Sequence, residues 1–177
     1  MKINNVALYF LLFFTVFCSS TIAAENSATY SDTSASKIKI NLVLAEQSGE
    51  YHSPYVAAWL ENDKNQAVRN LVLWRTKAKW LKDIRRWWRK IGRKDQQLVD
   101  GITSATRGVG SYPLTFKALD DNGNILPQGN YTLFIEVVRE KGGRAIVKQA
   151  ITLSNSPVHH TIKATPETGE IHITFTP

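Results

Sequence analysis

The chain has 177 residues with a net charge of +7, and 43% of its residues are apolar. This length and apolar content suffice for one ordinary domain and exclude disorder along the whole chain. The only cysteine, Cys18, lies in an N-terminal segment that we expect to be removed on export. A disulfide scaffold, a thiolate metal site and a cysteine nucleophile are therefore excluded from the mature protein.

The N-terminus has the three parts of a secretion signal. Lys2 precedes an apolar run over residues 6–17, and a small-residue exit at Ala23-Ala24 follows. The run is shorter than the roughly 20 residues of a spanning helix, so a retained membrane anchor is only the alternative. We predict export to the periplasm and a single folded domain. The predicted parts are a signal peptide at 1–24, a flexible polar leader at 25–36 and the domain at 37–177.

Most of the remaining chain shows the two-residue apolar alternation, or the short apolar runs, of β-strands. Glycine, asparagine, aspartate and proline residues interrupt these runs at short intervals, as in a sandwich of antiparallel sheets. The fold class is therefore predicted to be mainly β. The predicted strands are residues 38–45, 54–61, 68–74, 113–119, 131–139, 145–153, 158–164 and 171–175.

One segment, residues 79–91, has the helical period instead. Its apolar residues recur at intervals of three and four, and Gly92 follows as a stop signal. We predict one basic amphipathic helix, inserted into or lying across the β-sandwich. The apolar residues are Trp80, Leu81, Ile84, Trp87, Trp88 and Ile91.

Residues 75–94 concentrate the positive charge, with ten lysines and arginines against one acid, Asp83. In one interpretation the tryptophans cover one end of the sandwich and the cations form a solvated face. Alternatively, the helix rests on anionic lipid headgroups, or it forms the positive wall of a site for a phosphate-bearing aromatic ligand. We expect no nucleic-acid partner, because an exported protein rarely meets nucleic acid.

The segment after the helix, residues 100–106, reads Asp-Gly-Ile-Thr-Ser-Ala-Thr and lacks any periodicity. Its composition is typical of a surface loop. Its order resembles the acceptor motif of covalently flavinylated proteins, an Asp followed by a Ser/Thr-Gly-Ala-Thr core. In those proteins a secreted, magnesium-dependent FMN transferase uses FAD to esterify the final threonine with the FMN phosphate. The resemblance assigns the acid to Asp100, the first hydroxyl to Thr103, the alanine to Ala105 and the acceptor to Thr106, with Ser104 standing where glycine is usual.

Over nearly its whole mature length the chain also resembles a bacterial family of predicted periplasmic proteins, known only as a domain of unknown function. The block 120–133 additionally looks like the Ig-like domain of flagellar hook-capping proteins, which implies an Ig-like β-sandwich. Family members are associated with FMN transferases and with membrane-embedded PepSY-type reductases. The implied role is a periplasmic electron carrier rather than an enzyme. The segments that carry the family resemblance are 51–59, 79–89, 100–107, 120–133 and 139–143.

The resemblance further suggests how a covalently bound FMN would be surrounded. Arg107 and the basic helix would offset the charge of the phosphodiester. One of the aromatic residues Trp87, Trp88 and Tyr112 would stack on the isoalloxazine ring.

Other patterns predict no further site. The four histidines lack metal-ligand spacing, and the turn at 120–124 lacks the final glutamate of a calcium loop. The clustered hydroxyls at 103–106 show no nearby base in the sequence, so a hydrolase is disfavoured. The alternative function is a non-redox binding module whose basic, Trp-rich helix docks on anionic lipid, glycan or a partner protein.

Overall fold

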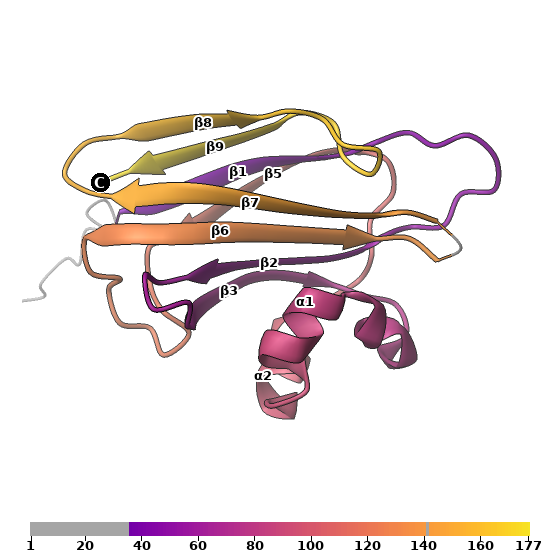
Figure 1. Ribbon diagram of the computed structural model, residues 1–177, viewed down its shortest axis with the longest axis horizontal. Coiled ribbons are helices and arrows are strands. Elements are labelled where there is room, and N and C mark those ends of the chain that lie inside the picture. Colours follow the sequence, from indigo (N-terminus) through magenta and orange to yellow (C-terminus); the bar gives the residue numbers. More distant parts are fainter. Residues whose placement is uncertain (1–35, 141) are drawn as a thin grey trace, which may run out of the picture. The chain divides into compact units, whose positions relative to one another are not determined.

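The structure is a computed structural model that describes residues 36–140 and 142–177 (Figure 1). The predicted signal peptide and all but the last residue of the predicted leader lie outside the described residues. The first sheet has the strand order β5 (Gly110–Lys117), β1 (Lys37–Leu44), β9 (Ile171–Thr176) and β8 (Val158–Ile162). The second has the order β4 (Thr103–Ser104), β3 (Ala67–Trp74), β2 (Tyr55–Glu61), β6 (Gly129–Val138) and β7 (Arg144–Leu153).

The two sheets pack as a sandwich, which confirms the predicted fold class. All strand pairs are antiparallel except β3 with the two-residue β4, which run parallel. All eight predicted strands are present, with ends that differ by a few residues. The strand predicted at 113–119, for example, is β5 and begins at Gly110.

The main core lies between the sheets and follows directly from the alternation in the sequence. In β1 the side chains of Ile38, Ile40, Leu42 and Leu44 all point inward and are at most 1% exposed. Burial of each such side chain stabilises the fold by about 1.5–3 kcal/mol. The intervening residue Lys39 is exposed, because the outer face of the first sheet is open to solvent.

The second sheet is covered on its outer face as well. Every residue of β2 is buried, which needs cover on both sides of that strand. The cover comes from residues 75–102, between β3 and β4, which we call the helical insertion (Figure 1). Trp59 and Phe134 of the sheet stack under it, with ring centroids 5.1 Å apart. The insertion therefore covers a face of the sandwich, whereas the sequence interpretation placed the tryptophans over one end.

The prediction of one continuous helix at 79–91 is wrong. The helical insertion consists of the 3-10 helix η2 (Ala78–Asp83), the α-helical turn α1 (Arg85–Trp87), the π-helical η3 (Trp88–Gly92) and the helix α2 (Gln96–Ile102). The break falls at Ile84, which has the non-helical angles φ −75° and ψ 69°. Its physical cause lies in the sheet: the Glu136 carboxylate accepts hydrogen bonds from the Arg86 and Trp87 amides, and so caps a new helix start there.

Candidate functional site

The acceptor-like motif begins in regular structure, although the sequence predicted a loop from Asp100 onward. Asp100 lies in the last turn of α2, and Thr103 and Ser104 form β4. The irregular segment starts only at Ala105 and carries Thr106 and Arg107. It crosses from β4 in the second sheet to β5 in the first, so the motif lies where the chain changes sheets at the edge of the sandwich.

Two capping interactions explain why α2 forms and where it stops. At its start the Asp95 carboxylate accepts a hydrogen bond from the Leu98 amide at 2.9 Å. At its end the Thr103 hydroxyl donates to the Val99 carbonyl oxygen at 2.6 Å. The chain then turns into β4, where Leu73 pairs with Thr103. The motif is thereby fixed against the end of β3.

Arg75 joins the first two polar residues of the motif. Its Nε donates to Thr103 Oγ1 at 3.1 Å, and its Nη2 lies 3.4 Å from Asp100 Oδ1. Its backbone amide donates to the Ser104 carbonyl oxygen at 2.8 Å. Ser104 occupies the usual glycine position of the motif in extended β4 backbone, a conformation that any residue adopts. Serine at this position therefore brings no backbone strain.

Thr106, the predicted acceptor, is partly exposed and lies outside the strands. Its Oγ1 is 2.8 Å from Thr76 Oγ1, and either hydroxyl is able to act as the donor. This bond holds the Thr106 side chain against the start of the helical insertion while the backbone around it stays free of sheet pairing. Thr106 is therefore not sealed in the core.

Arg107, the residue after Thr106, lies against two aromatic rings. The Arg107 guanidinium lies 4.6 Å from the Trp74 ring centroid and 5.2 Å from that of Tyr112. The two rings meet edge to face at 5.3 Å. The Tyr112 hydroxyl donates to the Gly108 carbonyl oxygen at 2.8 Å, which fixes the ring against the crossing segment. Trp74, which the sequence analysis did not single out, is thus part of this group.

The structure buries Trp87 beneath the helical insertion, so of the three aromatic residues offered as stacking partners it is the one with no exposed ring face. Trp87 is 0% exposed, and its Nε1 donates to Asn70 Oδ1 at 2.9 Å beneath the helical insertion. Trp88 is only partly buried, but it packs against the same apolar cluster. Of the three predicted aromatics, Tyr112 is the one with a printed contact to Arg107, the residue that follows the motif.

Two buried carboxylates contact the basic segment, which sequence reasoning missed: Glu61 pairs with two of its cations, and Glu136 accepts hydrogen bonds from its backbone. Glu61 is 1% exposed and Glu136 is 0% exposed. Glu61 lies 3.3 Å from both Arg86 Nη2 and Lys90 Nζ. Glu136 lies 2.7 Å from Nη2 of Arg144 and also accepts hydrogen bonds from the backbone amides of Arg86 and Trp87. The available signal was a lone acid in the apolar run of each of two strands, at the end of β2 and between Ile135 and Val137 of β6.

The calcium-like sequence 120–124 forms a tight turn held by its own side chains. The Asp120 carboxylate accepts hydrogen bonds from the Asn124 side chain at 3.0 Å and from the amides of Asn124 and Asn122. These bonds, that of the Asn124 side chain first, hold the pKa of Asp120 below its ordinary value. Gly123 takes the left-handed conformation, φ 86°, that closes the turn.

Two hollows in the surface of the described residues lie away from the motif. One runs between residues 62–68 and the loop 120–131, and another lies between that turn region and the segment 90–98. Thr106 lines neither of them.

The comparisons with known proteins identify a family without assigning an activity. No curated protein and no solved structure matches the chain significantly. Among the described residues, no helix is long and apolar enough to cross a membrane. A family model described as predicted periplasmic protein (DUF2271) matches residues 36–171, which is most of the chain and agrees with the predicted periplasmic location. The chain belongs to this family of predicted periplasmic proteins.

Proposed function

We propose that the protein is a periplasmic electron carrier with FMN attached through a phosphoester to Thr106. The observation that carries the proposal is the position of Thr106: the residue is partly exposed and lies in irregular backbone at the end of the acceptor-like motif. A modifying enzyme needs such a hydroxyl, because it must bring its own active site to the threonine oxygen.

The residues around Thr106 suit an acceptor. Ser104 and Ala105 are small and exposed, so they offer little steric hindrance to an approaching transferase. The Thr76 hydroxyl, 2.8 Å away, orients the Thr106 oxygen. In the proposed modification this oxygen bonds to the FMN phosphorus of FAD and the phosphoanhydride breaks. AMP leaves, and the hydroxyl proton passes to the transferase.

Arg107 and Tyr112 would form the immediate surroundings of the bound group. FMN, when bound, supplies exchange of single electrons and of electron pairs. Within the described residues Arg107 has no carboxylate partner, so its charge is available to a phosphodiester and to the anionic form of a reduced flavin. The partly exposed Tyr112 ring offers a stacking surface. Its proposed partners are an FMN transferase and a membrane-embedded, PepSY-type reductase.

The modification is tested by co-expressing the protein with an FMN transferase and examining a denaturing gel for flavin fluorescence. We expect a fluorescent band for the wild type and for Ser104→Ala, which removes a neighbouring hydroxyl. We expect no band for Thr106→Ala and a weaker band for Thr106→Ser, which keeps a hydroxyl. A wild-type band without fluorescence, or a fluorescent Thr106→Ala band, would overturn the proposal.

A second candidate is a non-redox binding module, favoured by the exposed cations of the helical insertion that have no ion pair in the described part of the chain. The intact mass of the protein from its native periplasm separates the two candidates. Flavinylation adds the mass of one FMN minus one water, whereas a binding module keeps the mass of the unmodified chain.

A further inference from the structure

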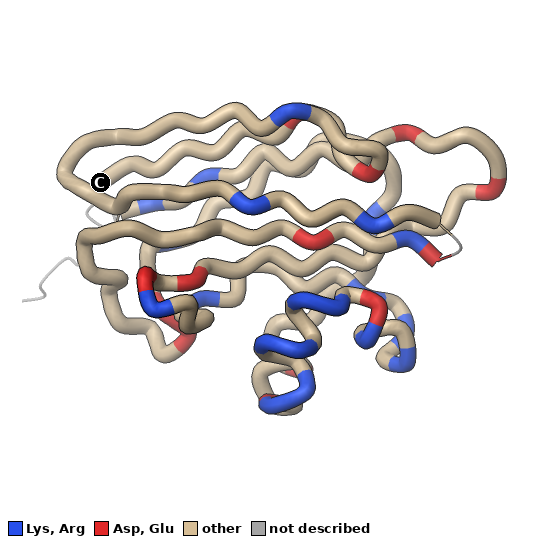
Figure 2. Tube along the Cα trace, viewed as in Figure 1, with Lys and Arg blue, Asp and Glu red and all other residues tan. Residues whose placement is uncertain are grey.

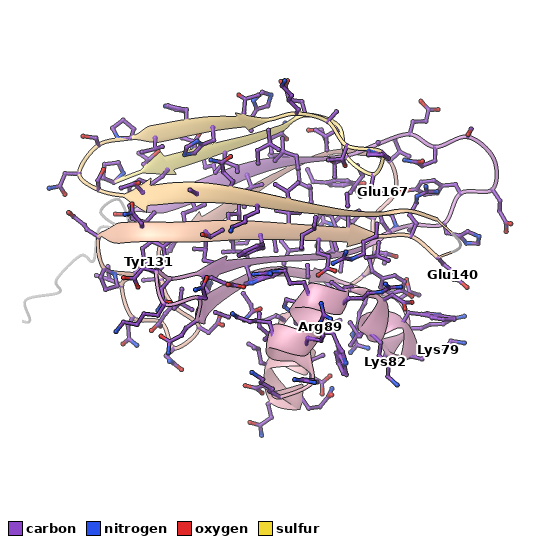
Figure 3. All side chains as sticks on the ribbon, viewed as in Figure 1. Lys79, Lys82, Arg89, Tyr131, Glu140 and Glu167 are labelled. Carbon is purple, nitrogen blue, oxygen red and sulfur yellow. The ribbon has the colours of Figure 1, made fainter. Side chains whose placement is uncertain are left out.

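The solvent side of the helical insertion carries a dense group of cations that form no ion pair within the described residues, although Lys79 lies 4.6 Å over the Trp80 ring. Figure 2 shows the lysines and arginines gathered on the helical segments, while the strands carry both signs of charge. Figure 3 shows Lys79, Lys82 and Arg89 on the part of the insertion that projects from the sandwich. Seven exposed cations of the insertion have no ion pair within the described residues: Lys77, Lys79, Lys82, Arg85, Arg89, Arg93 and Lys94.

These seven cations, which we call the outer cations, differ from the three that hold the insertion in place. Arg75, Arg86 and Lys90 each contact a carboxylate of the fold. Only Asp83 and Asp95 lie near the outer cations in sequence, and Asp95 is occupied in capping α2. A group of like charges repels itself and costs stability, so its presence points to an anionic partner.

The chemistry of the surface around the outer cations favours one kind of partner. A protein interface is anchored by buried aromatic and apolar side chains, and charge is depleted at its centre. The exposed large apolar residues of the described chain, Val109, Ile125 and Ile146, all lie outside the helical insertion. Binding to a layer of anionic lipid headgroups needs positive charge on the protein but no complementary surface shape. The partly exposed rings of Trp80 and Trp88 suit the same interfacial environment.

We propose that the outer cations bind the anionic headgroups of a phospholipid bilayer, so that the protein docks on a membrane surface through the helical insertion. Each cation near an anionic bilayer contributes about 1 kcal/mol at ordinary salt. The contact is electrostatic and peripheral, and the sandwich stays in water. The proposal uses no residue of the acceptor-like motif and does not depend on flavinylation.

The test is sedimentation of the protein, purified from the periplasm without bound flavin, with vesicles of phosphatidylcholine containing about one third phosphatidylglycerol. We expect binding at low salt and its loss at about 1 M salt, where screening acts over roughly 3 Å. The triple variant K82Q/R85Q/R89Q is expected to lower the partition coefficient about a hundredfold. The matched control K39Q/K148Q/K163Q removes three exposed cations of the sandwich and is expected to change it less than about threefold.

Three results would each overturn the proposal: no binding of the wild type to the anionic vesicles, equal binding to pure phosphatidylcholine vesicles, or unchanged binding of the triple variant. The first result would leave an acidic protein as the partner of the outer cations. Thermal unfolding of both triple variants checks that each is folded. Thr106→Ala is expected to bind like the wild type, so failure of the flavin proposal leaves this one intact.

Discussion

Arg85 and Arg86 are neighbours in α1, yet they belong to opposite sides of the helical insertion. Arg86 contacts the buried Glu61 at 3.3 Å and lies 4.0 Å over the Phe134 ring. Arg85 is exposed and has no ion pair within the described residues. The difference shows that a cluster of cations has no single role. The sheet beneath decides which of them hold the fold and which remain available to a partner.

The largest effect on stability is expected at Glu136, the buried carboxylate that caps α1 on the side of the insertion facing the sheet. Glu136→Gln keeps the shape of the side chain but removes the charge that faces Arg144 and the α1 amides. Disrupting a buried pair of this kind costs about 3–5 kcal/mol of unfolding free energy. Urea denaturation measures the loss, with the exposed Glu46→Gln as control, expected within about 0.5 kcal/mol of wild type. Equal stability of the two variants would contradict the assigned role of Glu136.

Two glycines of the insertion extend the comparison to packing. A Cβ at Gly92 would meet the rings of Trp87 and Trp88, the latter at 2.8 Å, whereas a Cβ at Gly101 would meet nothing within 4 Å. We expect Gly92→Ala to lower stability by about 1–3 kcal/mol through overpacking. Gly101→Ala is expected to raise it by about 0.5–1 kcal/mol, because alanine is the better helix former. Thermal unfolding of the pair measures both signs, and a stabilising Gly92→Ala would show that the insertion packs loosely.

A smaller effect is expected from the two neighbouring arginines themselves. Arg86→Gln removes one of the two cations that face Glu61, and the Arg86 side chain is 38% exposed. Allowing for solvent screening, we expect a loss of about 1 kcal/mol. Arg85→Gln is expected to stay within about 0.5 kcal/mol of wild type. If both variants lose the same stability, the division between the two sides is wrong.

The smallest effect concerns Asp120, a carboxylate outside the insertion that serves as a reference for the buried Glu61 and Glu136. Asp120 has a pKa lowered from 3.8, first by the Asn124 side chain. A lowered folded pKa means that the stabilisation is present above the unfolded pKa and is lost as pH falls through the folded value. We expect Asn124→Ala to move the Asp120 titration upward, toward 3.8, in an NMR titration. An unchanged midpoint would show that the backbone amides alone set this pKa.

The sandwich was predictable because its strands carry their own pattern. In β1 the buried positions alternate with exposed ones, and in β2 and β6 buried positions follow one another. Because buried positions carry apolar residues, the sequence shows the same patterns. The helix break at Ile84 was not predictable in this way. It depends on Glu136, which lies about fifty residues further along the chain and reaches α1 only in the folded state.

The candidate site shows a similar division. The position of Thr106 in an irregular segment agreed with the composition, while α2 and β4 were missed although Asp95 offers an N-cap signal three residues before Leu98. The burial of Trp87 was not predictable from its spacing. A tryptophan at helical spacing in a basic segment looks the same whether it faces a ligand or a sheet, and here it faces Asn70.

The double cover of β2 has a consequence for anyone who wishes to shorten this protein. Splicing out residues 75–102 would not leave a smaller working sandwich, because Trp59, Phe134 and Val138 would face water together with Glu61 and Glu136. Such a truncated chain would present a wide adhesive patch and would tend to aggregate. Miniaturisation has to begin with hydrophilic replacements along the outward side of β2 and β6. A natural relative without the insertion should already carry polar residues at every second position there.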